Sequence, residues 1–217
     1  MLMFFYSLIN NNLNSIINER QASVVMQYYN NHAVEYVKKT LPISMTEQYG
    51  KFLRNIPNNG SILDAGCGSG RDALYFLKNG YKVDAFDAST ELVKLAEELT
   101  GLNISCLRFQ EFCPHTIYDG IWANASLLHV PQKQLHDVLK TFKASLKSGG
   151  ILFCSFKYGK KDAINELGRS FTNKTCEMLD KDLSNAGFTS RRSIALQQST
   201  TPEGSPQAWV TGLAVAP

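Results

Sequence analysis

Three glycines at alternate positions form the most distinctive chemical motif of the chain. They lie in the stretch D-A-G-C-G-S-G-R, residues 64–71, between a short apolar run and a helical pattern. This order predicts a strand, a tight turn and a helix. Glycine permits backbone angles that a side chain forbids, and a helix N-terminus offers unpaired N–H groups to a ligand. The turn therefore predicts a cradle for a small molecule.

The spacing of these glycines argues against two common nucleotide sites. The dinucleotide fingerprint G-x-G-x-x-G would need its third glycine at position 71, where this chain has Arg71. A P-loop ends in Gly-Lys-Ser/Thr, whereas Gly70 is followed by Arg71 and Asp72. An acid two residues before the glycines, Asp64, instead suits a ligand with an ammonium and a second positive centre, and S-adenosylmethionine (SAM) has both. The alternative is a tight connection in some other α/β protein.

A second acid follows the next predicted strand. Tyr81 to Phe86 alternates as a strand does and ends at Asp87. In nucleotide-binding βαβ units, an acid about 20 residues past the glycines accepts hydrogen bonds from the ribose hydroxyls. We therefore predict Asp87, with Ala88, at a ribose; the alternative is an acid that only opens the next helix.

Two blocks of sequence carry a resemblance to a known family. The glycine stretch resembles motif I of the class I SAM-dependent methyltransferases. Residues 119–131, D-G-I-W-A-N-A-S-L-L-H-V-P, resemble the stretch after the fourth strand in the same family. Together the blocks look most like the small bacterial methyltransferases related to tellurite-resistance proteins. The resemblance implies transfer of a methyl group from SAM to a small-molecule acceptor, which leaves S-adenosylhomocysteine (SAH).

The resemblance also implies roles for particular residues. The cofactor-binding residues would be Tyr36, Asp64, Gly66, Cys67, Gly68, Gly70, Arg71, Asp87, Ala88, Gln110, Glu111, Phe112, Asn124 and Ala125. Residues 110–112 would surround the adenine, with the Phe112 ring stacked on it. Arg71 would pair with the cofactor carboxylate, or else with Asp72 or Asp119. His129 is the candidate catalytic base or substrate-orienting group; its alternative is a packing role.

The remaining periodicity predicts a Rossmann-like α/β fold with helices on both faces of a mostly parallel seven-stranded sheet and an antiparallel last strand. The third strand is predicted at 103–109, and a helix is predicted at 132–147. Helical patterns at 21–40 and 44–54 predict a lid within residues 23–56, although plain core packing of the tyrosines would give the same pattern. Residues 23–217 are expected to form one domain after an extension at 1–22. The basic segment 157–171 is expected either to shape the acceptor pocket or to form a solvated loop.

Composition limits the kinds of partner that we expect this protein to bind. A net charge of +3 with scattered cations does not favour nucleic acid, and the apolar start of the chain is too short for a membrane span. Five cysteines without a C-x-x-C pair indicate a reducing compartment, the cytoplasm, and the four histidines lack metal-site spacing. We expect no metal, and a monomer or homodimer. The rival functions are a SAM-binding enzyme of other transfer chemistry and a non-catalytic SAM-binding module.

Overall fold

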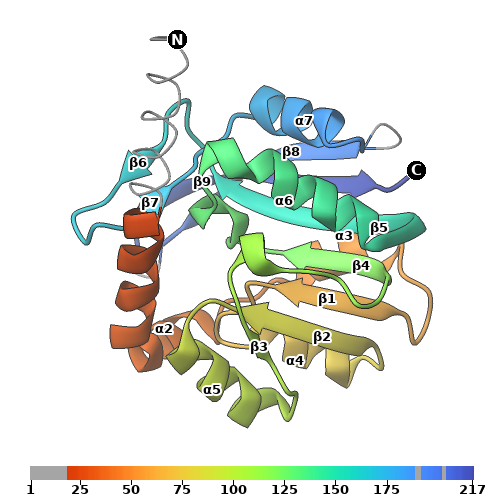
Figure 1. Ribbon diagram of the computed structural model, residues 1–217, viewed down its shortest axis with the longest axis horizontal. Helices are drawn as coiled ribbons and strands as arrows, with labels where there is room; N and C mark the ends of the chain where they lie inside the picture. Colours follow the sequence, from red (N-terminus) through yellow and green to blue (C-terminus); the bar gives the residue numbers. More distant parts are fainter. Residues whose placement is uncertain (1–18, 189–191, 202–203) are drawn as a thin grey trace, which may run out of the picture.

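A seven-stranded sheet organises the chain. The computed structural model describes residues 19–188, 192–201 and 204–217. The strand order is β3-β2-β1-β4-β5-β9-β8 (Figure 1). The first five strands pair in parallel, and β9 runs antiparallel to both of its neighbours, which confirms the predicted fold. The strands are β1 Ser61–Ala65, β2 Lys82–Asp87, β3 Ser105–Cys106, β4 Tyr118–Ala123, β5 Leu146–Lys157, β8 Arg192–Thr200 and β9 Pro206–Val215.

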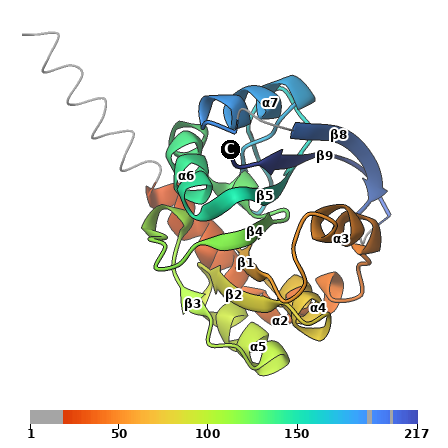
Figure 2. The same ribbon diagram turned by 90° about the vertical axis from the view of Figure 1, so that its right-hand side faces the viewer.

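Helices cover both faces of the sheet, because the central strands are buried on both sides. In β4, Ile121 and Ala123 join the core under one set of helices, and Trp122 joins the core on the opposite face. Helices α6 and α7 lie on the first face, and α3, α4 and α5 lie on the second (Figure 2). Their bounds are α3 Thr46–Leu53, α4 Arg71–Lys78, α5 Thr90–Thr100, α6 Gln132–Ala144 and α7 Cys176–Asn185. No helix in these described residues has the length and apolar character to cross a membrane.

The predicted helix at 21–40 is interrupted in the structure. One helical segment covers 19–31, and α2 covers Ala33–Thr40. The break lies at His32, whose φ of −120° is not helical and whose Nδ1 donates a hydrogen bond to the Tyr28 carbonyl at 2.8 Å. Residues 19–22, predicted to belong to an extension, are part of the first segment; residues 1–18 lie outside the described residues. Both segments lie near the carboxyl ends of β1, β2 and β4 (Figure 1).

Helix α3 does not belong to the lid predicted for residues 23–56. Its Tyr49 and Phe52 are buried, and they pack against Phe76 and Trp122 on the α4 face of the sheet. None of its residues lines the cavity described below. The aromatic pattern at 44–54 therefore reflects core packing, and only the segments on either side of His32 cover the site.

Three connections differ from the sequence prediction. The predicted strand at 103–109 is reduced to the two residues of β3, and a 3-10 turn, η1 Phe109–Glu111, follows it. Strand β5 begins at Leu146, the end of the predicted helix, because Leu146 pairs with Tyr118 before the register shifts. The basic segment 157–171 contains an antiparallel hairpin, β6 Ala163–Ile164 and β7 Ser170–Phe171.

Candidate functional site

The glycine turn after β1 takes the shape that its sequence predicts. Gly66, Gly68 and Gly70 have φ values of 75°, 53° and 74°, which only glycine adopts without strain. A Cβ on Gly66 would lie 2.6 Å from Ser126 Cβ, and one on Gly68 would lie 3.2 Å from Tyr36 Cε1. The backbone therefore passes directly beneath the second sequence block and the lid.

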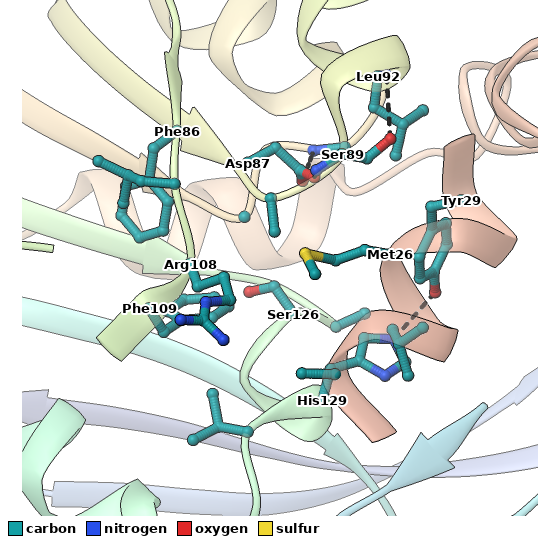
Figure 3. Close-up of a pocket in the computed structure, with 18 of the residues that line it drawn as sticks. Met26, Tyr29, Phe86, Asp87, Ser89, Leu92, Arg108, Phe109, Ser126 and His129 are labelled. Atoms are coloured by element: carbon teal, nitrogen blue, oxygen red, sulfur yellow. Dashed lines mark hydrogen bonds between the residues drawn. The ribbon is translucent and has the colours of Figure 1, made fainter. Parts of the chain in front are cut away.

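A cavity opens where this turn meets the lid. Its walls come from the turn, the end of β2, η1, a second 3-10 turn η2 Leu127–His129, and the helical segment 19–31 (Figure 3). Eight of the predicted site residues line it: Tyr36, Gly66, Gly68, Asp87, Ala88, Gln110, Ala125 and His129. Residues that the sequence analysis did not assign to the site also line it, among them Ala22, Met26, Phe86, Ser89, Phe109 and Ser126.

Asp87 is the carboxylate on the wall of this cavity. Its Oδ2 accepts a hydrogen bond from the Gly68 amide at 2.9 Å, and its Oδ1 accepts one from the Ser89 amide at 2.9 Å. Burial raises the pKa of Asp87, and these amide hydrogen bonds oppose that rise. A carboxylate has about four acceptor positions, so the two amides leave two for hydroxyl groups of a ligand.

Asp64 lies deeper, at the end of β1. It is buried, and its Oδ2 has no hydrogen-bond partner in the described structure. Burial raises the pKa of Asp64 well above its ordinary value, and the Asp72 charge raises it further. A buried unpaired acceptor is unfavourable unless a donor or cation reaches it. Asp64 is therefore suited to receive an ammonium group.

Asp72 is the centre of a buried polar network beneath the turn. It accepts hydrogen bonds from Tyr49 Oη at 2.5 Å, Arg71 Nε at 2.6 Å and Trp122 Nε1 at 2.7 Å. Burial alone would raise the pKa of Asp72, but the Arg71 charge and these donors hold it below its ordinary value. Of the partners left open for Arg71, the structure shows Asp72; Asp119 instead receives hydrogen bonds from Ser61 and Lys147.

The chain after β4 is held in an unusual conformation. Ala125 has a φ of 51°, which is uncommon for a residue with a Cβ. Ser155 Oγ accepts a hydrogen bond from the Ala125 amide at 2.7 Å and donates one to Asn124 Oδ1 at 2.8 Å. Ser155 on β5 therefore fixes the turn that brings Ala125 to the cavity wall. Asn124 Nδ2 donates a hydrogen bond to Asp72 Oδ2 at 3.4 Å.

Seven further predicted residues do not line the cavity. They are Asp64, Cys67, Gly70, Arg71, Glu111, Phe112 and Asn124. Phe112 stacks on Phe86 at 5.1 Å between ring centres, and Glu111 is bound by Arg108. The 3-10 turn η1 puts Phe109 and Gln110 at the cavity instead, so the aromatic candidate for adenine is Phe109. Periodicity could not reveal this, because it had suggested a longer third strand.

His129 has both ring nitrogens in hydrogen bonds. Nδ1 lies 3.0 Å from the Ser170 carbonyl oxygen, which can only accept, so Nδ1 carries the proton. Nε2 must then accept the hydrogen bond from Tyr29 Oη at 2.9 Å (Figure 3). Burial, helped by the nearby charges of Arg169 and Lys157, lowers the pKa of His129 to about 4, although the hydrogen bond to the Ser170 carbonyl opposes this shift. The imidazole is neutral at physiological pH.

The burial of His129 predicts a loss of stability in mild acid. An unfolded chain protonates this histidine near pH 6.5, whereas the folded protein does so near pH 4. The free energy of unfolding should therefore fall by about 1.6 kcal/mol between pH 6.5 and pH 5 through this group. Urea titrations at the two pH values should show a fall that is smaller by about this amount in His129→Gln than in wild type. His136→Gln, at an exposed position of α6, should keep the wild-type loss; equal losses in all three proteins would contradict the prediction.

Specific contacts hold the helical segment 19–31 and α2 against the starts of α5 and α4. Asn30 Oδ1 accepts hydrogen bonds from Ser89 Oγ at 2.7 Å and from the Glu91 amide at 3.3 Å, at the start of α5. Arg71 Nη1 donates to the Thr40 carbonyl at 3.1 Å, at the end of α2. The segments on both sides of His32 are therefore positioned by the residues that follow the glycine turn and β2.

Comparison with known proteins identifies the family. The methyltransferase-domain family matches residues 37–195, which is more than half of the chain. This chain belongs to the class I SAM-dependent methyltransferases. SAM is the cofactor of the family, and the matched range contains the glycine turn, Asp87 and the block after β4.

Relatives and solved structures share this fold. Malonyl-[acyl-carrier protein] O-methyltransferase of Salmonella typhimurium is 26% identical over 117 residues, 52% of this chain and 46% of that protein. The chain thus spans about half the length of this relative. A Burkholderia thailandensis 1,6-didemethyltoxoflavin-N1-methyltransferase, solved with bound 1,6-didemethyltoxoflavin and SAH, has a TM-score of 0.72 at 19% identity, and the match covers 92% of this chain and 90% of that chain. TehB from Haemophilus influenzae has a TM-score of 0.65 at 17% identity, and the match covers 84% of this chain and 66% of TehB.

The residues of this chain fit the cofactor. Asp64 Oδ2 is a buried acceptor without a partner, and SAM carries an ammonium group. Gly66 and Gly68 line the cavity with backbone alone, and Asp87 retains free acceptor positions. No described cluster of three or more His, Cys, Asp or Glu residues has a metal-binding arrangement.

Proposed function

We propose that this protein transfers the methyl group of SAM to a small-molecule acceptor. The observation that supports this most strongly is that one cavity holds both Asp87, with two acceptor positions free, and the hydrogen-bonded Tyr29–His129 pair. The helical segment 19–31 closes over this cavity, as an enclosed small molecule would require. A SAM-binding enzyme of other transfer chemistry and a non-catalytic module are the rival functions.

We assign the cofactor contacts to residues that line the cavity and to Asp64, which lies deeper and does not line it. Asp64 would receive the ammonium, Asp87 the ribose hydroxyls, and Phe109 with Gln110 the adenine. Tyr36 covers Gly68 from the lid, and its phenol is buried. When bound, SAM supplies a methyl group on a sulfonium, which is already activated for transfer. The protein then contributes chiefly alignment and the exclusion of water, which can be worth several kcal/mol.

Tyr29 and His129 would handle the proton of the acceptor. Because His129 Nδ1 donates to Ser170, only Nε2 is free to take a proton, and it faces the Tyr29 hydroxyl. Tyr29 Oη can accept a proton from the acceptor atom as it passes its own proton to His129. With a pKa of about 4, His129 is neutral but weakly basic. This suits an acceptor that loses its proton as the methyl group arrives.

Replacing Tyr29 with phenylalanine should slow turnover. General acid–base groups typically contribute 10²–10⁴-fold to a rate, and we expect a loss of at least about tenfold because this base is weak. The measurement is the rate of SAH production under saturating SAM with an oxygen or nitrogen acceptor. The proteins compared should bind SAH with the same affinity. Tyr28→Phe, which keeps the neighbouring ring, is the control. Equal turnover in the two variants would assign the Tyr29–His129 pair a packing role.

The acceptor and the compartment are further parts of the proposal. The five cysteines are free, in support of a reducing compartment such as the cytoplasm.

The acceptor is tested with a panel of thiols, phenols, amines, selenite and tellurite. Acyl carrier protein is included as a macromolecular acceptor, and mass spectrometry identifies both products. SAH together with a small molecule heavier by one methylene supports the proposal. Methylated acyl carrier protein alone, a product other than SAH, or SAM binding without turnover would favour the rivals.

A further inference from the structure

Two cations lie together beside the Tyr29–His129 pair without a balancing carboxylate. Lys157 Nζ is 3.9 Å from the centre of the Phe171 ring, and Arg169 Cζ is 5.4 Å from the same centre. Within the part of the chain that the structure describes, neither Lys157 nor Arg169 forms an ion pair. We call Lys157, Arg169 and Phe171 the cationic cluster.

The fold places this cluster next to His129, which lines the cavity, although the residues of the cluster do not line it themselves. Lys157 ends β5, and Arg169 lies in the β6–β7 hairpin, where its guanidinium stacks on Tyr28 at 4.2 Å. The His129 ring packs on Phe171 at 5.1 Å between centres and donates to the Ser170 carbonyl. The cluster therefore lies behind the Tyr29–His129 pair, where β5, the hairpin and the lid meet.

The electrostatics of the cluster are unfavourable as they stand. Burial lowers the pKa of Lys157, and the like charge of Arg169 lowers it further. Arg169 Nε is buried and has no hydrogen-bond partner in the described structure. A half-buried pair of like charges with an unused donor is a costly arrangement for packing alone, and an anion would relieve both the repulsion and the unpaired donor.

We propose that the cationic cluster binds an anionic group of the methyl acceptor, a carboxylate or a phosphate. An acceptor held there would present its nucleophilic atom to the Tyr29–His129 pair on the cavity side. The aromatic rings of Tyr28 and Phe171 flank the two cations, so an acceptor with a flat apolar body next to the anionic group fits best. This inference rests on the proposed function of the same site.

The first test needs only the wild-type protein. Benzoate, phenyl phosphate and the uncharged benzamide are titrated by calorimetry into the protein, both saturated with SAH and free of it. We expect benzoate or phenyl phosphate to bind at least about tenfold more tightly than benzamide; which anion binds better identifies the preferred group. Equal affinities for all three compounds would overturn the proposal. Because the titration is also run without SAH, failure of SAH to bind would count against the cofactor assignment and not against the anion site.

Variants then separate this site from the cofactor site. Arg169→Gln and Lys157→Met should each reduce anion affinity at least about tenfold, and Arg169→Lys should restore part of it. Lys160→Met, at an exposed position near the end of β5, should change nothing. SAH affinity should stay within twofold of wild type in all of them. Unchanged anion affinity, or a tenfold loss of SAH affinity that assigns the cluster to the cofactor carboxylate, would contradict the proposal.

Discussion

Replacing Asp72 with alanine should lower the free energy of unfolding by about 3–5 kcal/mol, the usual effect of removing one partner of a buried charged network. The carboxylate is 6% exposed and accepts from Arg71, Tyr49 and Trp122. Alanine would leave the guanidinium, a phenol and an indole N–H without their acceptor in a buried site. Urea unfolding should show a lower midpoint at an unchanged m-value.

The control for this prediction is an exposed ion pair. Asp180 pairs with Arg192 at 2.7 Å, but its side chain is 48% exposed. Such pairs are usually worth at most about 1 kcal/mol, so Asp180→Ala should destabilise the protein only slightly. If Asp72→Ala and Asp180→Ala unfold at the same urea concentration, Asp72 does not organise the buried network that we describe.

Replacing Asp87 with alanine should weaken SAH binding by about 100-fold. Two charge-assisted hydrogen bonds to ribose hydroxyls would be lost, each worth on the order of 1.5–3 kcal/mol, and every 1.4 kcal/mol is a factor of ten in affinity. The variant also leaves the Gly68 and Ser89 amides without their acceptor, so the glycine turn should loosen as well. Calorimetric titration with SAH measures the loss.

Asp84 provides the matched control on the same strand. It is exposed, and it accepts a hydrogen bond from Tyr118 Oη at 2.9 Å, away from the cavity. Asp84→Ala should bind SAH as wild type does. Thermal unfolding of both variants shows whether each is folded at the titration temperature. A folded Asp87→Ala protein with SAH affinity within threefold of wild type would refute the ribose assignment.

The fold could be predicted because its signals are local. Successive side chains of a strand point to opposite faces, so the apolar run in β4 assigns Ile121 and Trp122 to opposite faces, and both are fully buried. The glycine turn could be predicted for the same reason, since positive φ values at alternate residues are a property of the backbone that glycine alone permits easily. Neither inference needs knowledge of distant residues.

The parts of the site that the sequence could not give depend on contacts between distant segments. Phe109 and Phe112 are equally aromatic, and only the 3-10 turn decides that Phe109 reaches the cavity while Phe112 packs on Phe86. At the helix break, the His32 ring donates a hydrogen bond to the Tyr28 carbonyl. Helical periodicity in the sequence does not reveal such a contact. Arg169 becomes notable only when the hairpin lies against Tyr28 and Phe171.

The most direct test of the central claim is amide hydrogen exchange with and without SAH, read by mass spectrometry at peptide resolution. If the cavity beneath the lid is the cofactor site, SAH should slow exchange in residues 66–70, 87–92 and 107–110 and in the lid segment 22–36. The β8–β9 hairpin, which does not line the cavity, should exchange at the same rate in both states. Protection confined to that hairpin, or no protection at a saturating SAH concentration, would contradict this placement of the site.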